Sequence, residues 1–188
     1  MPQIFDESMP FTPLHMGPGL LIKAVAGRNF SLLTFGVAQI VMDIEPLVGI
    51  IRDSEVLHGY THTYLAALVI VPIVVLIAPI LGRPILRRWN RELSYYHLDC
   101  LVSPESWAHL PVIMGAFSGT LFHIVLDSIM HADIRPLVPW SNSNVLLDLV
   151  SIDALNQGCL VAGVVGAIAW LFFGWYQRER NGAGHPTR

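Results

Sequence analysis

Charged residues are scarce in this chain. Asp, Glu, Lys and Arg make up 13% of its 188 residues, whereas a soluble domain carries roughly 25%. Hydrophobic residues make up 53%. This balance argues against a disordered chain, a coiled coil or an ordinary soluble domain, and it favours a membrane protein. We expect residues 1–188 to form a single membrane-embedded domain.

Excess positive charge and clustered cysteines are lacking as well. The chain has 11 Lys and Arg against 14 Asp and Glu, and it contains no basic cluster dense enough to follow a phosphate backbone. Nucleic acid is therefore not an expected partner. The two cysteines, Cys100 and Cys159, lie far apart and match neither a redox motif nor a zinc-finger spacing, so we expect unpaired thiols.

Long uncharged segments are what the chain has instead. Residues 63–82 and 154–177 contain no charge and are long enough to cross a bilayer, which takes about 20 apolar residues. Residues 106–126 contain no acid, Lys or Arg, although two histidines lie among them. We predict a long membrane helix for each segment, since prolines such as Pro72 and Pro79 are tolerated in membrane helices.

The N-terminal part predicts a short helical hairpin. Residues 14–26 and 29–42 are each apolar but too short for a full crossing, and Pro46 is expected to end the second arm. Residues 145–155 mix apolar and acidic side chains and predict a short helix at the membrane interface. The fold predicted is all-α, a polytopic membrane helix bundle with a short N-terminal hairpin and three long membrane helices.

Positive charge is divided unevenly between the two predicted sides of the membrane. One side receives the hairpin turn, the loop predicted at 82–105 and the C-terminal tail. The other side, with the loops at 45–61 and 130–156, keeps only Arg52 and Arg135 among all Lys and Arg. Cytoplasmic loops are the ones enriched in Lys and Arg, so this other side is expected to be extracytoplasmic.

Histidines and acids gather at helix ends on that outer side. The hairpin places His15 and Asp43 at nearly the same depth, because they lie about equally far from its turn, and His58 and His62 are one helical turn apart. His123, Asp127 and His131 are also four residues apart, so we expect them on one face of the helix predicted to begin at residue 106. The complete set is His15, Asp43, Glu45, His58, His62, His123, Asp127, His131 and Asp133.

Imidazole and carboxylate ligands predict a divalent metal site. They suit Zn²⁺ first, with Mn or Fe as alternatives, and the set is large enough for one or two ions. A carboxylate inside a membrane helix costs about 2.5–3.5 kcal/mol, which a bound cation would offset. The expected metal ligands are His15, Asp43, His58, His62, His123, Asp127 and His131, and the candidate general bases are Glu45 and Asp133.

Plainer roles are open for several of these side chains. His15 taken alone is typical of an interfacial or core histidine, and Asp43 of a hydrogen-bonded acid at a helix end. Three roles are open for each of His58, His131 and Asp133: ligand of a second ion, group that orients a ligand, or ordinary loop residue.

Four segments between about His15 and Trp140 carry a family resemblance. They are the helix that opens with His15, Asp-Ile-Glu-Pro at 43–46, Gly-Tyr-Thr-His-Thr at 59–63 and Phe-His-Ile-Val-Leu-Asp at 122–127. Their order and spacing resemble the inner-membrane-associated metal-dependent hydrolases, a family that includes a LexA-binding member. The resemblance implies a hydrolase of the bacterial inner membrane whose metal residues are His15, Asp43, His62, His123 and Asp127. Glu45 stands where that pattern has an aspartate, and His58 where it has an arginine.

The sequence thus predicts a membrane-bound hydrolase that uses metal-activated water. A site at the interface meets headgroups by lateral diffusion, so the expected partners are the lipid bilayer and a lipid-like or phosphorylated substrate, cleaved at a phosphoester or other ester. Two alternatives stay open. Intramembrane acids and histidines also serve metal-ion or proton transporters, although clustering at one side favours a site over a conduit. A non-catalytic membrane adaptor would bind no stoichiometric metal.

Overall fold

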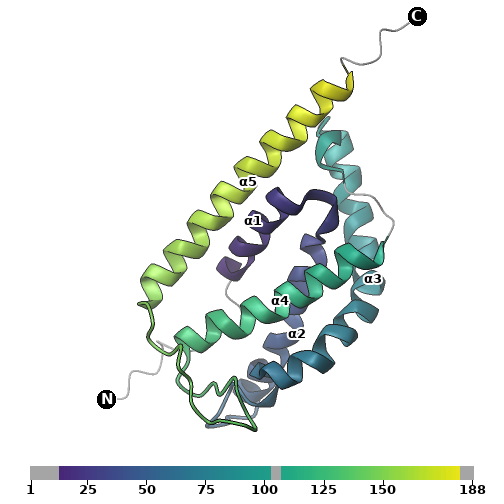
Figure 1. Cartoon of the computed structure of the whole chain (residues 1–188). Coiled ribbons are helices and arrows are strands. Elements are labelled where there is room, and N and C mark those ends of the chain that lie inside the picture. Colours follow the sequence, from purple (N-terminus) through teal and green to yellow (C-terminus); the bar gives the residue numbers. More distant parts are fainter. Residues whose placement is uncertain (1–12, 103–106, 183–188) are drawn as a thin grey trace, which may run out of the picture.

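The structure is a computed structural model that describes residues 13–102 and 107–182, and this part of the chain is helical without strands (Figure 1). The predicted all-α bundle is confirmed. Its five α-helices are α1 (Met16–Ala26), α2 (Leu32–Ile51), α3 (Tyr64–Tyr95), α4 (His109–Met130) and α5 (Ile152–Gly182). Short 3-10 turns precede α1 at Pro13–His15 and α3 at Tyr60–His62.

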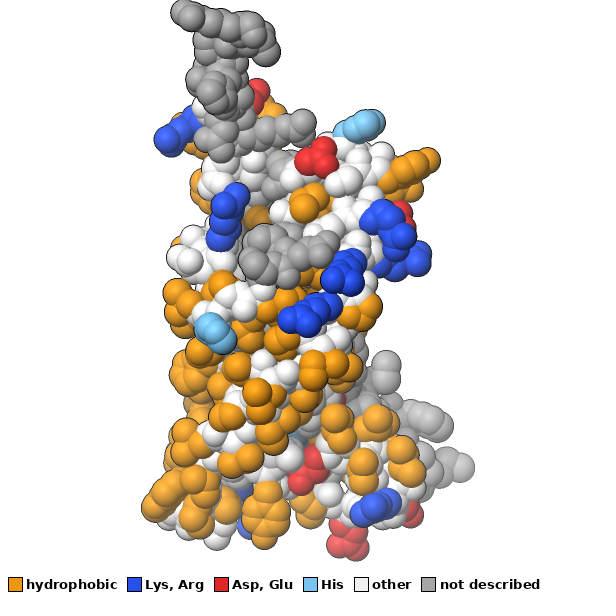
Figure 2. Space-filling model, turned by 90° about the vertical axis from the view of Figure 1, so that its right-hand side faces the viewer, with side chains coloured by type: hydrophobic (Ala, Val, Ile, Leu, Met, Phe, Trp, Pro, Cys, Tyr) orange, Lys and Arg blue, Asp and Glu red, His pale blue; other side chains and the backbone are white. Residues whose placement is uncertain are grey.

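Four helices, α2 to α5, are long and apolar enough to cross a membrane. Hydrophobic side chains cover much of the molecule's side, and blue Lys and Arg side chains gather toward the end that carries the C-terminus (Figure 2). The chain is therefore an integral membrane protein in its fold, with its positive charge concentrated toward one end of the bundle.

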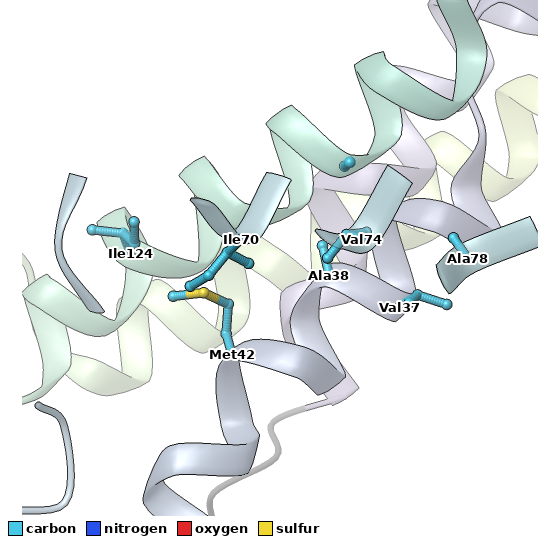
Figure 3. Packing of buried hydrophobic residues seen from close by; sticks show 8 residues of the cluster. Val37, Ala38, Met42, Ile70, Val74, Ala78 and Ile124 are labelled. Atoms are coloured by element: carbon cyan, nitrogen blue, oxygen red, sulfur yellow. The ribbon is translucent and has the colours of Figure 1, made fainter. Parts of the chain in front are cut away.

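The helices pack in two groups. Helices α2, α3 and α4 share an apolar core that includes Ala38, Met42, Val74 and Ile124 (Figure 3). Helix α1 lies along α5. A β-carbon on Gly17 of α1 would overlap the backbone carbonyl of α5, so this close approach depends on glycine.

The second arm of the predicted hairpin is longer than expected. Helix α2 continues through Pro46 to Ile51, so the prediction that Pro46 ends the helix is wrong. Proline removes one backbone hydrogen bond from a helix, but the ring of Pro46 is fully buried, and membrane helices tolerate such a loss when neighbouring groups pack against them.

Two other predicted segments differ from the structure. Helix α3 runs to Tyr95 through most of the loop predicted at 82–105, because charged residues that end a membrane span need not end a helix; Arg88 and Glu92 form an exposed i,i+4 pair there. Residues 145–151 form turns instead of an interfacial helix, and Asp148 adopts a left-handed backbone conformation with φ of 56°. Of the predicted 106–126 span, residue 106 lies outside the described residues.

Candidate metal centre

Asp127 lies among three histidines near the C-terminal end of α4. This end of α4 lies at the opposite end of the bundle from the C-terminus of the chain (Figure 1). The Asp127 carboxylate oxygens are 3.0 Å from Nε2 of His123, 3.5 Å from Nε2 of His62 and 3.6 Å from Nδ1 of His15. The Asp127 side chain is 5% exposed. The side chains come from the turn before α1, the turn before α3, and α4, so three distant stretches of sequence meet here.

Helix α2 adds a second carboxylate to the cluster. Asp43 Oδ1 lies 3.3 Å from Nε2 of His123, which places this imidazole between two acids. The ring centroids of His15 and His62 are 5.7 Å and 5.3 Å from that of His123. A buried carboxylate needs a partner of opposite sign, which either a protonated imidazole or a bound cation supplies.

Three buried imidazole nitrogens lack an aligned hydrogen bond. Among the described residues, Nε2 of His15, His62 and His123 is buried without a hydrogen-bond partner, although carboxylate oxygens lie near two of these atoms. Burying a polar atom unpaired is costly. A cation held between Nε2 of His62, Nε2 of His123 and the two carboxylates would remove the cost for these two rings, and Nδ1 of His15 lies near the same Asp127 carboxylate. The donor set therefore fits a divalent metal ion of the zinc type.

Gln39 fixes the orientation of the His123 ring. Its side-chain amide donates to the carbonyl oxygen of Gly119 at 3.0 Å, which turns its Oε1 toward Nδ1 of His123 at 2.6 Å. Since an amide oxygen only accepts, Nδ1 carries a proton and donates it, and in the neutral ring Nε2 then keeps its lone pair for a metal ion. The sequence reasoning missed Gln39. The available signal was a polar side chain in an apolar arm, one helical turn before Asp43.

Removing the Gln39 acceptor is expected to weaken metal binding without removing a ligand. Gln39→Met keeps the length of the side chain but leaves Nδ1 of His123 unpaired, so metal affinity should fall by roughly 10–100-fold. Competition titration with a metal-sensitive dye measures this. Gln157→Met, an exposed position on α5, is the matched control, and equal affinities in the two variants would contradict the orienting role.

Glu45 ties the turn before α3 to α2. Its Oε2 accepts hydrogen bonds from the backbone of Gly59 and Thr61 and from the Thr61 hydroxyl, and it lies 3.7 Å from Nδ1 of His62. Burial alone would lower the pKa of His62, but the neighbouring carboxylates of Asp127 and Glu45 raise it. The two carboxylates therefore favour a positive charge at His62, whether a proton or a metal ion.

Asp133 holds His58 in the same manner at the edge of the cluster. Its Oδ2 accepts from the backbone of Leu57 and His58, and its Oδ1 lies 3.0 Å from Nδ1 of His58. The His58 ring stacks on that of His131 with centroids 4.2 Å apart. Burial, with His131 and His62 nearby, lowers the pKa of His58, and burial likewise lowers the pKa of His15. Neutral imidazole is the form that binds metal.

The predicted site residues all lie in this one cluster. Three overlapping groups each bring ligand atoms within 4.8 Å of one another: His15, His123 and Asp127; His58, His62 and Asp127; and His58, His131 and Asp133. Asp43 joins through His123, and Glu45 through His62. Since Asp127 and His58 each belong to two groups, the arrangement is suited to two neighbouring ions as well as one.

Comparison with known families gives one match. A profile of the family described as YdjM inner membrane protein matches residues 19–183. That range includes every residue of the cluster except His15. No curated protein and no solved structure matches the chain.

Proposed function

The chain belongs to the YdjM inner membrane protein family, and we propose that it is a membrane-bound, metal-dependent hydrolase that cleaves a phosphoester or other ester of an amphiphile. One observation carries the proposal: three histidines surround the buried Asp127 carboxylate, and the Nε2 atoms that His62 and His123 turn toward it have no hydrogen-bond partner. Clusters of unpaired polar groups in a buried site are characteristic of functional centres.

The residues divide into two ligand sets. His15, Asp43, His62, His123 and Asp127 would supply the ligands of a first divalent ion, zinc before Mn or Fe, and His58 and His131 would contribute to a second. The chemistry that such an ion supplies is activation of water and polarisation of the ester's oxygen.

The general base is proposed to be Glu45 or Asp133. A base must reach the attacking water, and these two are the most accessible of the cluster's carboxylates, with side chains 31% and 28% exposed. Both also accept hydrogen bonds from backbone N–H groups, which keep them ionised and in place.

Location supports an amphiphilic substrate. The cluster lies at the ends of membrane-spanning helices, where lipid headgroups are found. The Arg residues of the last turns of α3 lie away from it, so by the positive-inside rule the cluster faces the extracytoplasmic side of the inner membrane. Among the described residues, the buried histidines and acids all lie in the cluster and none follows the bundle toward its other end, which argues against a proton or metal conduit.

Chelation is expected to remove both metal and activity. Detergent-purified protein should carry about one to two divalent ions per chain by elemental analysis. EDTA treatment should abolish hydrolysis of phospholipid in mixed micelles, and zinc should restore it.

His62→Ala and His109→Ala form a matched pair for this test. His109 is exposed at the opposite end of α4, so its replacement should leave the metal content unchanged, whereas His62→Ala should lower it. A parent protein purified without metal would refute the hydrolase and would favour an adaptor.

A further inference from the structure

A groove of about 270 Å³ lies at the same end of the bundle as the metal centre. Its walls come from the beginnings of α1 and α5, the C-terminal part of α4 and the loop that leads into α5. The lining includes Pro18, Leu126, Val150, Leu155 and Gly158. The lining offers hydrocarbon and a cysteine thiol but no charged side chain. Such a groove selects an apolar ligand, because a polar group would lose its hydrogen bonds to water there.

The groove and the metal centre are formed by neighbouring residues of the same two helices, α1 and α4, and of the turn before α1. Leu126 directly precedes Asp127, and Pro18 lies one helical turn after His15, whose ring is 3.6 Å from Asp127. A ligand in the groove therefore lies alongside the two elements that hold the cluster.

Gly158 leaves the groove open. A β-carbon built on Gly158 meets nothing within 4 Å, whereas one on Gly166 of the same helix would overlap the backbone of α1. Glycine in a helix interior costs about 1 kcal/mol relative to alanine. At Gly166 close packing accounts for the glycine, but at Gly158 the missing side chain only creates space.

We propose that this groove binds one acyl chain of a membrane phospholipid and so presents the lipid's ester or phosphoester groups to the metal centre. The second half of this statement rests on the proposed function, while the binding itself does not. On α5 the lining residues Ala154 and Gly158 are themselves exposed, so the groove opens to the surface of this helix. A membrane helix with such an exposed face is surrounded by acyl chains, so hydrocarbon from the bilayer has continuous access to the groove.

Photolabelling with lipid tests the inference. The full chain is reconstituted into vesicles of phosphatidylethanolamine and phosphatidylglycerol that contain a phospholipid with a diazirine on its acyl chain, and labelled peptides are mapped by mass spectrometry. Label should concentrate on residues 150–159 relative to the rest of α5. Gly158→Trp, which fills the groove, should lose that label, and Val161→Trp, at an exposed position of the same helix, should keep it.

Gly158→Leu fills the groove with a smaller side chain and provides a second test in case the tryptophan variant misfolds. It should lose the label too. Uniform label along α5, or groove label that persists in both Gly158 variants, would overturn the proposal. A groove occupied by residues 1–12 or by a second copy of the chain would stay unlabelled in the parent, which also overturns it. Because the lining contains no metal ligand, the label should be the same after EDTA treatment, so this result is independent of whether the metal hypothesis holds.

Discussion

Asp127→Asn is expected to abolish high-affinity metal binding while the chain stays folded. Asparagine has nearly the shape of aspartate but no negative charge, and Asp127 is the carboxylate that contacts three histidines. Metal affinity should fall by more than about 100-fold, beyond the usual effect of replacing a residue that only orients a ligand. The metal-free variant should unfold at a lower temperature than the metal-free parent, because the Asp127 carboxylate is the buried partner of the His62 and His123 rings, and removing one partner of a buried pair destabilises the fold. Dye competition and thermal unfolding in detergent measure the two effects.

Asp148→Asn is the matched control. The chemical change is the same, but Asp148 is exposed, and its left-handed backbone conformation is one that asparagine also adopts readily. This variant should bind metal as the parent does. If Asp127→Asn binds metal as tightly as Asp148→Asn does, the buried carboxylate is not a ligand.

The sequence predicted the membrane helices where length and apolarity agree. Helices α3, α4 and α5 were each found from an uncharged run, because the bilayer imposes the same requirement on every crossing segment. Helix α2 was underestimated, since Asp43 and Glu45 interrupt its apolar run and Pro46 normally ends a helix. Both acids face a cluster of histidines, so the signal that shortened the prediction belongs to the site itself.

The sequence also predicted which side chains would meet, but not how each is held. Spacing along one helix placed His123 and Asp127 on a common face, and the structure has them 3.0 Å apart. The contact between Gln39 and His123 joins two helices, and its geometry depends on the crossing of α2 and α4. No local pattern encodes that crossing, because it is set by the packing of small residues between the two helices.

Gly119→Val is therefore expected to damage the fold and the metal centre together. A β-carbon at Gly119 would lie 2.7 Å from the carbonyl oxygen of Phe35 and 2.7 Å from the β-carbon of Ala38, so α2 and α4 would have to separate. Overpacking of this kind costs about 1–3 kcal/mol. Separation would also break the hydrogen bond from Gln39 to the Gly119 carbonyl and release the His123 ring. A lower unfolding temperature and weaker metal binding should appear in the same variant.

Gly158→Val is the control for Gly119→Val. It shows the general cost of valine in a helix without the clash between α2 and α4. The substitution is identical, but the β-carbon meets nothing within 4 Å, so the unfolding temperature and metal affinity should stay close to those of the parent. If Gly119→Val instead unfolds and binds metal as Gly158→Val does, α2 and α4 do not approach closely at Gly119. In that case Gln39 could not reach both the Gly119 carbonyl and His123, and the orientation of the His123 ring would need another cause.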